Sequence, residues 1–134
     1  MKKPEPFFKE PYTAAAVAAD ASHFPYLCVL LQSLLDHISD QNHYDIIVVG
    51  VHLTKKMQQT AYQSVSECHN LMLRFINLTG HADSLEQAKQ YLPWMMEKYS
   101  RVIYLESDWV LPDDIAENRN ACNHVKSRDF LDLE

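Results

Sequence analysis

The sequence predicts an α/β protein with a Rossmann-like, mainly parallel sheet that has helices on both faces. Four short apolar runs alternate with three segments of helical periodicity, and the connections between them are short. Such alternation is typical of parallel strands joined by right-handed crossovers. The chain has 134 residues, of which 47% are hydrophobic. This is enough for one domain with a core of its own.

The first strand and helix follow from small apolar residues and from leucines at helical spacing. The run TAAAVAA over 13–19 indicates a strand that is buried on both faces. Leucines then recur every three or four positions between Phe24 and Ile38, which predicts an amphipathic helix. Pro25 fits the first turn of this helix.

The second strand and helix are predicted from the run YDIIVVGVHL and from the residue that follows it. The run predicts a strand over 44–53 that ends near Gly50. Thr54 is expected to be the N-cap of a helix over 55–68.

The third strand and helix follow the same order. The run LMLRFINL predicts a strand over 71–78. Ser84 and Gln87 form a capping box for a helix that begins near residue 85. This helix is expected to bend near Pro93 and to continue to Lys98.

The fourth strand is predicted over 101–105 from the run RVIYL, and acidic residues follow it directly. Asp20 likewise follows the first strand. In open α/β sheets the ligand crevice lies outside the carboxyl ends of the strands. The sequence therefore predicts a binding site that is formed by Asp20 together with Glu106 and Asp108.

The chain divides into three parts by composition. Residues 1–12 form a polar leader that three prolines keep from regular structure. Residues 13–117 form the α/β domain. Residues 118–134 have no clear periodicity and are expected to form an irregular C-terminal tail.

Charge and composition exclude several ligand classes. The formal net charge is −6 and no long Lys/Arg cluster exists, so no nucleic-acid partner is expected. Only two glycines are present, which excludes a Gly-rich phosphate loop and favours a metal as the phosphate binder. The three cysteines are far apart, and no signal peptide or apolar run long enough to span a bilayer occurs. We therefore expect a cytoplasmic protein without a transmembrane segment.

The acids after the fourth strand have two interpretations. In an extended segment Glu106 and Asp108 would point to the same side, with Ser107 directed away. Two such carboxylates suit Mg²⁺ or Mn²⁺, which complete their coordination with phosphate oxygens. The alternative is a solvated turn and helix start, and Asp113 and Asp114 fit that alternative because acids favour helix N-termini.

Two motifs taken together resemble those of glycosyltransferase family 8, which includes glycogenin and bacterial lipopolysaccharide galactosyltransferases. They are AAVAADASHFPYLCVLLQSLLDH at the first strand and helix, and YSRVIYLESDWVLPDDIAE at the fourth strand. The resemblance covers roughly residues 13–117. It implies the nucleotide-diphospho-sugar transferase fold, GT-A, and metal-dependent transfer of a hexose from a UDP-sugar to an acceptor hydroxyl with retention.

The resemblance also implies roles for residues at the first strand end. The backbone near Ala18 and Ala19 and the side chain of Asp20 would contact the uracil and ribose of a UDP-sugar. His23 stands where the family has a tyrosine that stacks on the uracil, and an imidazole ring can stack over a smaller area.

The residues at the second motif would bind the metal and the sugar diphosphate. Glu106, Ser107 and Asp108 stand at the family's Asp-x-Asp motif, so Glu106 and Asp108 would be ligands of Mn²⁺ or Mg²⁺. Glu106 is one methylene longer than the usual aspartate. Lys89 stands where the family has an arginine that contacts the nucleotide sugar, and it keeps the charge without the planar fork.

The chain is shorter than the members of this family. It corresponds to their N-terminal, nucleotide-sugar-binding half, and the other half carries much of the acceptor site and a metal-binding histidine. We therefore expect a truncated protein, which implies either a dimer or a second half supplied separately. The alternative to an active enzyme is a catalytically inactive nucleotide-sugar-binding or protein-interaction domain. The resemblance leaves the acceptor open among a carbohydrate, a lipopolysaccharide and a protein. A cytoplasmic location peripheral to a membrane is compatible with each of these acceptors.

Overall fold

The structure is a computed structural model that describes residues 2–116 and 123–124. The alternating strands and helices predicted from the sequence are present in it, followed by a short fifth strand. The strands are β1 (Thr13–Asp20), β2 (Tyr44–Val51), β3 (Leu71–Asn77), β4 (Val102–Leu105) and β5 (Asn123–His124). The helices are a short 3₁₀ helix η1 (Ala21–His23), α1 (Phe24–Leu35), α2 (Lys55–Val65) and α3 (Leu85–Met95).

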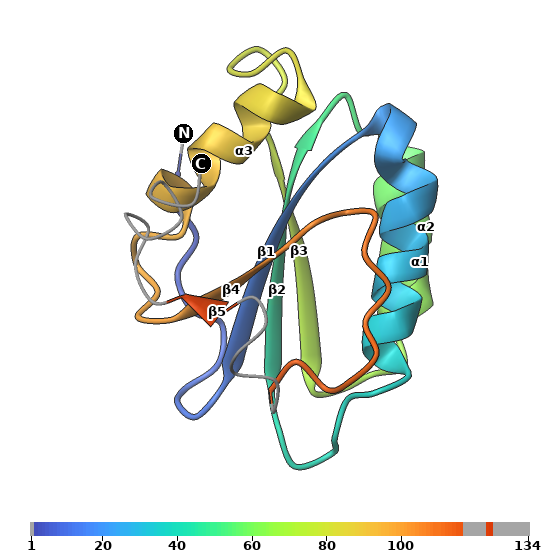
Figure 1. Ribbon diagram of the computed structural model, residues 1–134, viewed down its shortest axis with the longest axis vertical. Helices are drawn as coiled ribbons and strands as arrows, with labels where there is room; N and C mark the ends of the chain where they lie inside the picture. The colour runs from blue at the N-terminus through green and yellow to red at the C-terminus, as the bar shows by residue number, and fades with distance from the viewer. Residues whose placement is uncertain (1, 117–122, 125–134) are drawn as a thin grey trace.

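The sheet has the strand order β3-β2-β1-β4-β5, and its first four strands are parallel (Figure 1). Val17 in the middle of the sheet is paired with Val48 of β2 on one side and with Leu105 of β4 on the other. The β5 strand pairs antiparallel with β4 and was not predicted, because it follows a stretch without periodicity. The prediction of a mainly parallel α/β sheet is confirmed.

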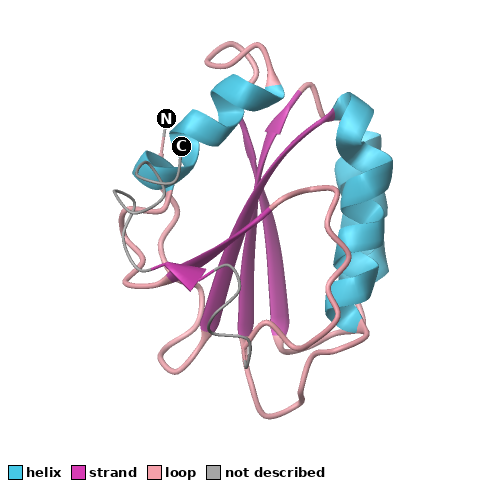
Figure 2. Cartoon of the chain, viewed as in Figure 1, coloured by secondary structure: helices cyan, strands magenta, loops and turns pink. Residues whose placement is uncertain are grey.

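The helices cover both faces of the sheet, as Figure 2 shows. Alternate residues of β1 face opposite layers: Ala15, Val17 and Ala19 belong to the core beneath α1 and α2, and the intervening alanines belong to the core beneath α3. The small side chains of β1 are buried on both faces, as the continuous apolar run predicted.

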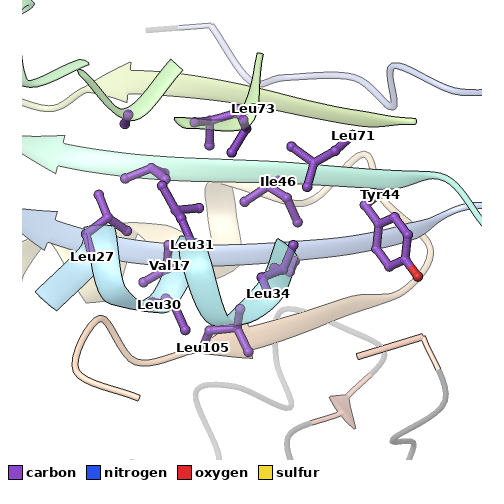
Figure 3. Packing of buried hydrophobic residues seen from close by; sticks show 14 of the residues in the cluster. Val17, Leu27, Leu30, Leu31, Leu34, Tyr44, Ile46, Leu71, Leu73 and Leu105 are labelled. Atoms are coloured by element: carbon purple, nitrogen blue, oxygen red, sulfur yellow. The ribbon is translucent and has the colours of Figure 1, made fainter. Parts of the chain in front are cut away.

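The leucines of α1 form the face of this helix that packs on the sheet (Figure 3). Leu27, Leu30, Leu31 and Leu34 are each at most 2% exposed. Burying one leucine side chain contributes about 1.5–3 kcal/mol, so this stripe is the largest apolar contribution of any helix here. This packing positions the first turn of α1, and therefore also the loop between β1 and α1.

The helices are shorter at their carboxyl ends than the sequence predicted. The α3 helix ends at Met95 instead of Lys98, and the residues after it form turns. Pro93 lies in the last turn of α3, where it cannot donate the helical hydrogen bond to the Lys89 carbonyl. The first helix likewise ends at Leu35 and the second at Val65.

The segment after β4, residues 106–116, contains no helix and is called the crossing segment below. It leaves the carboxyl end of β4, crosses to the side of α1 and runs along that helix toward the amino end of the sheet (Figure 1). Its backbone N–H at Leu111 donates to Ser33 Oγ at 2.9 Å, and Ile115 joins the core beneath α1.

Asp113 and Asp114 belong to the crossing segment, and a helix that starts after them would extend into residues 117–122, which lie outside the described part of the chain. Asp114 accepts hydrogen bonds from the buried Tyr44 hydroxyl at 2.8 and 2.9 Å and from the Ala116 N–H at 2.9 Å. Buried apolar residues hold the segment against α1, so Asp114 closes a turn there and Asp113 remains exposed.

A buried polar cluster lies beneath the N-terminal residues. Asp45 of β2 is fully buried and binds Arg74 Nη2 at 2.8 Å and the Tyr99 hydroxyl at 2.7 Å. The Phe7 N–H also donates to Asp45, and Arg74 Nη2 donates to the Glu5 carbonyl. Burial and the neighbouring carboxylate of Asp45 raise the pKa of Tyr99. The N-terminal residues are thus fastened to the sheet without regular structure of their own.

Candidate functional site

Asp20 ends β1 at the carboxyl edge of the sheet and organises the loop that follows. Its Oδ1 oxygen accepts from the His23 N–H at 2.9 Å and from Ser22 Oγ at 2.9 Å, and it lies 2.7 Å from His23 Nδ1. These bonds cap η1. Among the described residues, no hydrogen-bond partner is found for the other carboxylate oxygen, Oδ2. That oxygen can therefore accept from a ligand.

The electrostatics of Asp20 keep it ionised. Burial alone would raise the pKa of its carboxyl group, but the hydrogen bonds from His23 and Ser22 outweigh burial and lower the pKa below its ordinary value. A carboxylate at a strand end that stays charged is suited to accept from hydroxyl or N–H donors.

An aromatic surface lies beside Asp20. The His23 ring centroid is 6.0 Å from that of Tyr26, and the two rings are tilted by 47°. Tyr26 is 55% exposed in the first turn of α1. The sequence reasoning included His23 and missed Tyr26, although its position three residues later, in the first turn of a predicted helix, was a signal that the two lie together.

The residues after β4 form a turn instead of an extended segment. The Trp109 N–H donates to the Glu106 carbonyl at 3.1 Å, which closes the turn over Glu106–Trp109. Ser107 is 4% exposed, whereas the Glu106 side chain is 45% exposed and Asp108 is exposed. The two carboxylates therefore reach solvent from one turn, and Ser107 is buried between them in the sequence.

Lys89, a residue of α3, contacts the turn after β4. Its Nζ lies 3.0 Å from Glu106 Oε2 and 3.9 Å from Glu86 Oε1. Burial alone would lower the pKa of the Lys89 ammonium, but the hydrogen bond and charge of Glu106, together with the charges of Glu86 and Asp108, raise it. Lys89, Glu106 and Asp108 thus form one electrostatic group.

The sheet brings the two strand ends to the same edge. Leu105 of β4 is paired with Val17 of β1, so Asp20 lies three residues beyond this pair on the neighbouring strand. Ala18 and Ala19 are 3% and 0% exposed, so both residues belong to the core of the sheet. The predicted site residues lie at the carboxyl ends of two adjacent strands, in the loops that follow them, and on α3.

The donors at this edge fit a metal that takes few protein ligands. Among residues 2–116 and 123–124, no group of three or more His, Cys, Asp or Glu side chains is placed to hold a metal ion. Mg²⁺ and Mn²⁺, however, are commonly bound by one or two carboxylates with water and phosphate oxygens in the other positions. Glu106 Oε1 and both oxygens of Asp108 have no hydrogen-bond partner among the described residues. Both side chains therefore have carboxylate oxygens available for such a substrate-completed site.

The comparisons with solved structures show glycosyltransferases. The WbbM bifunctional glycosyltransferase in its apo form matches with a TM-score of 0.77 and 20% identity, over 89% of this chain and 22% of that chain. The galactosyltransferase LgtC in complex with donor and acceptor sugar analogs matches with a TM-score of 0.64 and 18% identity, over 81% and 42%. The glycosyltransferase GlyE of Streptococcus pneumoniae TIGR4 matches with a TM-score of 0.64 and 18% identity, over 81% and 27%.

Other comparisons and the length of the chain bound this likeness. No protein-family model matches the sequence, and no curated protein matches it. The chain spans less than half the length of each of the solved glycosyltransferases named above. Within the described residues, no helix is long and apolar enough to cross a membrane. The comparisons show that the chain has the GT-A fold of these glycosyltransferases, over a part of their length.

Proposed function

We propose that this chain binds a nucleotide sugar and that, with a divalent metal, it takes part in the transfer of a hexose from a UDP-sugar to an acceptor hydroxyl with retention. The observation that carries the proposal is the position of Asp20 and the Glu106–Asp108 turn at the carboxyl ends of neighbouring parallel strands. Ligands of open α/β sheets bind at this edge. The likeness to glycosyltransferases supplies the ligand class.

The nucleoside would lie against the loop after β1. Asp20 Oδ2 would accept from ribose hydroxyls or the uracil N–H, because Oδ1 is already occupied by η1. Backbone groups near Ala18 and Ala19 would complete this contact. His23 and Tyr26 present aromatic rings beside the same loop, and such rings can stack on a base.

The diphosphate and sugar would lie against the turn after β4. Glu106 and Asp108 would hold Mn²⁺ or Mg²⁺, and Lys89 would contribute a further positive charge toward the phosphates. When bound, the metal would neutralise the negative charge of the diphosphate leaving group. The buried Ser107 would fix the spacing of the two carboxylates.

A second candidate function is binding without catalysis. The chain spans 22%, 42% and 27% of the three glycosyltransferases named above. A chain of this extent fits a nucleotide-sugar-binding or protein-interaction domain, or a half that is completed by a second copy or another chain. The acceptor would then be bound by the other part.

The test is isothermal titration calorimetry with UDP in the presence and absence of Mn²⁺. We expect binding that requires Mn²⁺, that is lost in Asp108→Ala and that is retained in Asp113→Ala. Asp113 is the matched control because it is an exposed carboxylate of the same crossing segment. Absence of binding at millimolar UDP would contradict the proposal.

Turnover separates the two candidate functions. Hydrolysis or transfer of UDP-glucose or UDP-galactose, measured as UDP release, would support the enzyme. Metal-dependent UDP binding without UDP release would support the binding domain instead.

A further inference from the structure

We propose that the Lys89–Glu106 ion pair makes metal binding at this site conditional on the nucleotide diphosphate. In the free protein the Lys89 ammonium group is paired with the Glu106 carboxylate. When the metal binds to Glu106, Lys89 would pair with the nucleotide diphosphate instead. This inference rests on the proposed function and assigns Lys89 a positioning role that a phosphate contact alone does not include.

The contact geometry supports an exchange of cations at Glu106. Lys89 Nζ lies 3.0 Å from Glu106 Oε2, and the two side chains are 25% and 45% exposed. They come from different elements, α3 and the turn after β4, so the contact forms only through tertiary packing. Glutamate at position 106 has one methylene more than aspartate, and this added reach is directed toward Lys89.

In the absence of an anion, a metal ion bound at this turn and the Lys89 ammonium group repel each other. Glu106 and Asp108 are the two carboxylates that fit the metal, and Lys89 already contacts one of them and is in electrostatic range of the other. A divalent cation that binds the same carboxylates lies close to the ammonium group, and like charges at this separation repel each other. Lys89 therefore weakens metal binding to the free protein.

A nucleotide diphosphate reverses this effect. Its negative charges can contact the metal on one side and the Lys89 ammonium on the other, so the repulsion between the two cations is replaced by attraction to a shared anion. Metal and nucleotide then bind with positive coupling, and each raises the affinity of the other by the same factor.

The test compares Mn²⁺ binding by wild type and Lys89→Gln, with and without UDP. Binding is followed by the electron paramagnetic resonance signal of free Mn²⁺. We expect Lys89→Gln to bind Mn²⁺ alone about tenfold more tightly, because the competing charge is gone. We also expect UDP to raise its Mn²⁺ affinity by a smaller factor than it does in wild type.

The matched control is Lys98→Gln, which removes one positive charge from an exposed position after α3. It should behave as wild type in both titrations. Glu106→Asp is the second variant: it keeps a carboxylate and shortens the reach to Lys89, so it should also bind Mn²⁺ alone more tightly than wild type does. Far-UV circular dichroism checks that each variant is folded.

The outcomes separate this inference from the proposed function. If Lys89→Gln matches wild type both in Mn²⁺ affinity and in its response to UDP, while wild type binds UDP with Mn²⁺, the inference is wrong and the proposed function stands. If wild type binds no UDP at millimolar concentration with Mn²⁺ present, both are wrong.

Discussion

The two ends of the sheet use their acidic residues in different ways. At the amino end, both oxygens of the fully buried Asp45 are engaged by Arg74, and Oδ2 also accepts from the Phe7 N–H and the Tyr99 hydroxyl. At the carboxyl end, Asp20, Glu106 and Asp108 are partly or largely exposed. Each of the three keeps at least one oxygen without a hydrogen-bond partner among the described residues.

This difference separates structural carboxylates from ligand-facing ones. A buried carboxylate is tolerated only when its partners compensate the loss of hydration. An exposed carboxylate with a free oxygen adds little to stability and remains available for a cation or a hydroxyl group. The comparison therefore predicts that substitutions at the amino end unfold the protein, whereas those at the carboxyl end change binding.

The largest effect on stability is expected from Asp45→Ala. It leaves the Arg74 guanidinium without its carboxylate partner, and it leaves the Tyr99 hydroxyl with only its longer contact to the Glu5 carbonyl, at 3.2 Å. We expect the free energy of unfolding to fall by about 3 kcal/mol, measured by urea denaturation. Asp83→Ala, at an exposed position, is the control and should change it little. A loss below about 1 kcal/mol for Asp45→Ala would contradict the structural role of this carboxylate.

The next largest effect is expected from Tyr44→Phe. The Tyr44 hydroxyl donates to Asp114 and accepts from the Ser39 N–H, and the side chain is fully buried. The loss of this hydroxyl should lower the free energy of unfolding by about 1–2 kcal/mol, because the partly buried Ser39 N–H and Asp114 carboxylate lose a hydrogen-bond partner. Tyr62→Phe removes a hydroxyl from an exposed ring and should be close to neutral in the same denaturation experiment. Equal effects of the two variants would show that the hydrogen bond between Tyr44 and Asp114 does not stabilise the fold.

Asp20→Ala should have a smaller and pH-dependent effect. The cap on η1 is expected to contribute about 1 kcal/mol at neutral pH. The pKa of Asp20 is lower in the folded than in the unfolded protein, so this contribution is present above the unfolded-state pKa and is lost as pH falls through the folded-state pKa. Denaturation in neutral and in acidic buffer should show the gap between wild type and variant shrinking on acidification. A gap that widens would reverse the assigned sign.

The smallest effect on stability is expected from Glu106→Gln. The Lys89–Glu106 pair is partly exposed, and pairs of this kind contribute about 0.5 kcal/mol or less. Thermal unfolding should therefore be nearly unchanged, while Mn²⁺-dependent UDP binding should be strongly reduced. Destabilisation as large as that of Asp45→Ala would place Glu106 among the structural carboxylates instead.

The sequence predicted the parts of this structure that depend on local pattern. The alanine run of β1 and the leucine spacing of α1 are periodic signals, and both elements are where these signals placed them. Thr54 and Ser84 cap α2 and α3 as expected, because a capping bond joins residues three positions apart. The carboxyl ends of the helices were predicted too far along the chain, because Ile38, Cys68 and Met96 continue the apolar pattern into the turns that follow.

The parts that the sequence did not predict depend on contacts between distant residues. Asp45 is one acid inside an apolar strand, and its partners Arg74 and Tyr99 lie 29 and 54 positions away. Asp114 resembled a helix-start residue, and the hydroxyl that binds it lies 70 positions earlier in the chain. The family resemblance suggested a ligand role for Lys89, whereas its ion pair with Glu106 follows only from the packing of α3 against β1 and β2 beside the end of β4.

The hydrogen bond from the Leu111 N–H to Ser33 Oγ has a consequence for measuring motion in this protein. This amide belongs to the segment that begins at Glu106, but its acceptor is a side chain of α1. It can exchange with deuterium only when the segment lifts from the helix, so its exchange rate reports that opening separately from the unfolding of the sheet. Comparing this rate with and without UDP and Mn²⁺ would show whether ligand binding changes how often the segment lifts from α1.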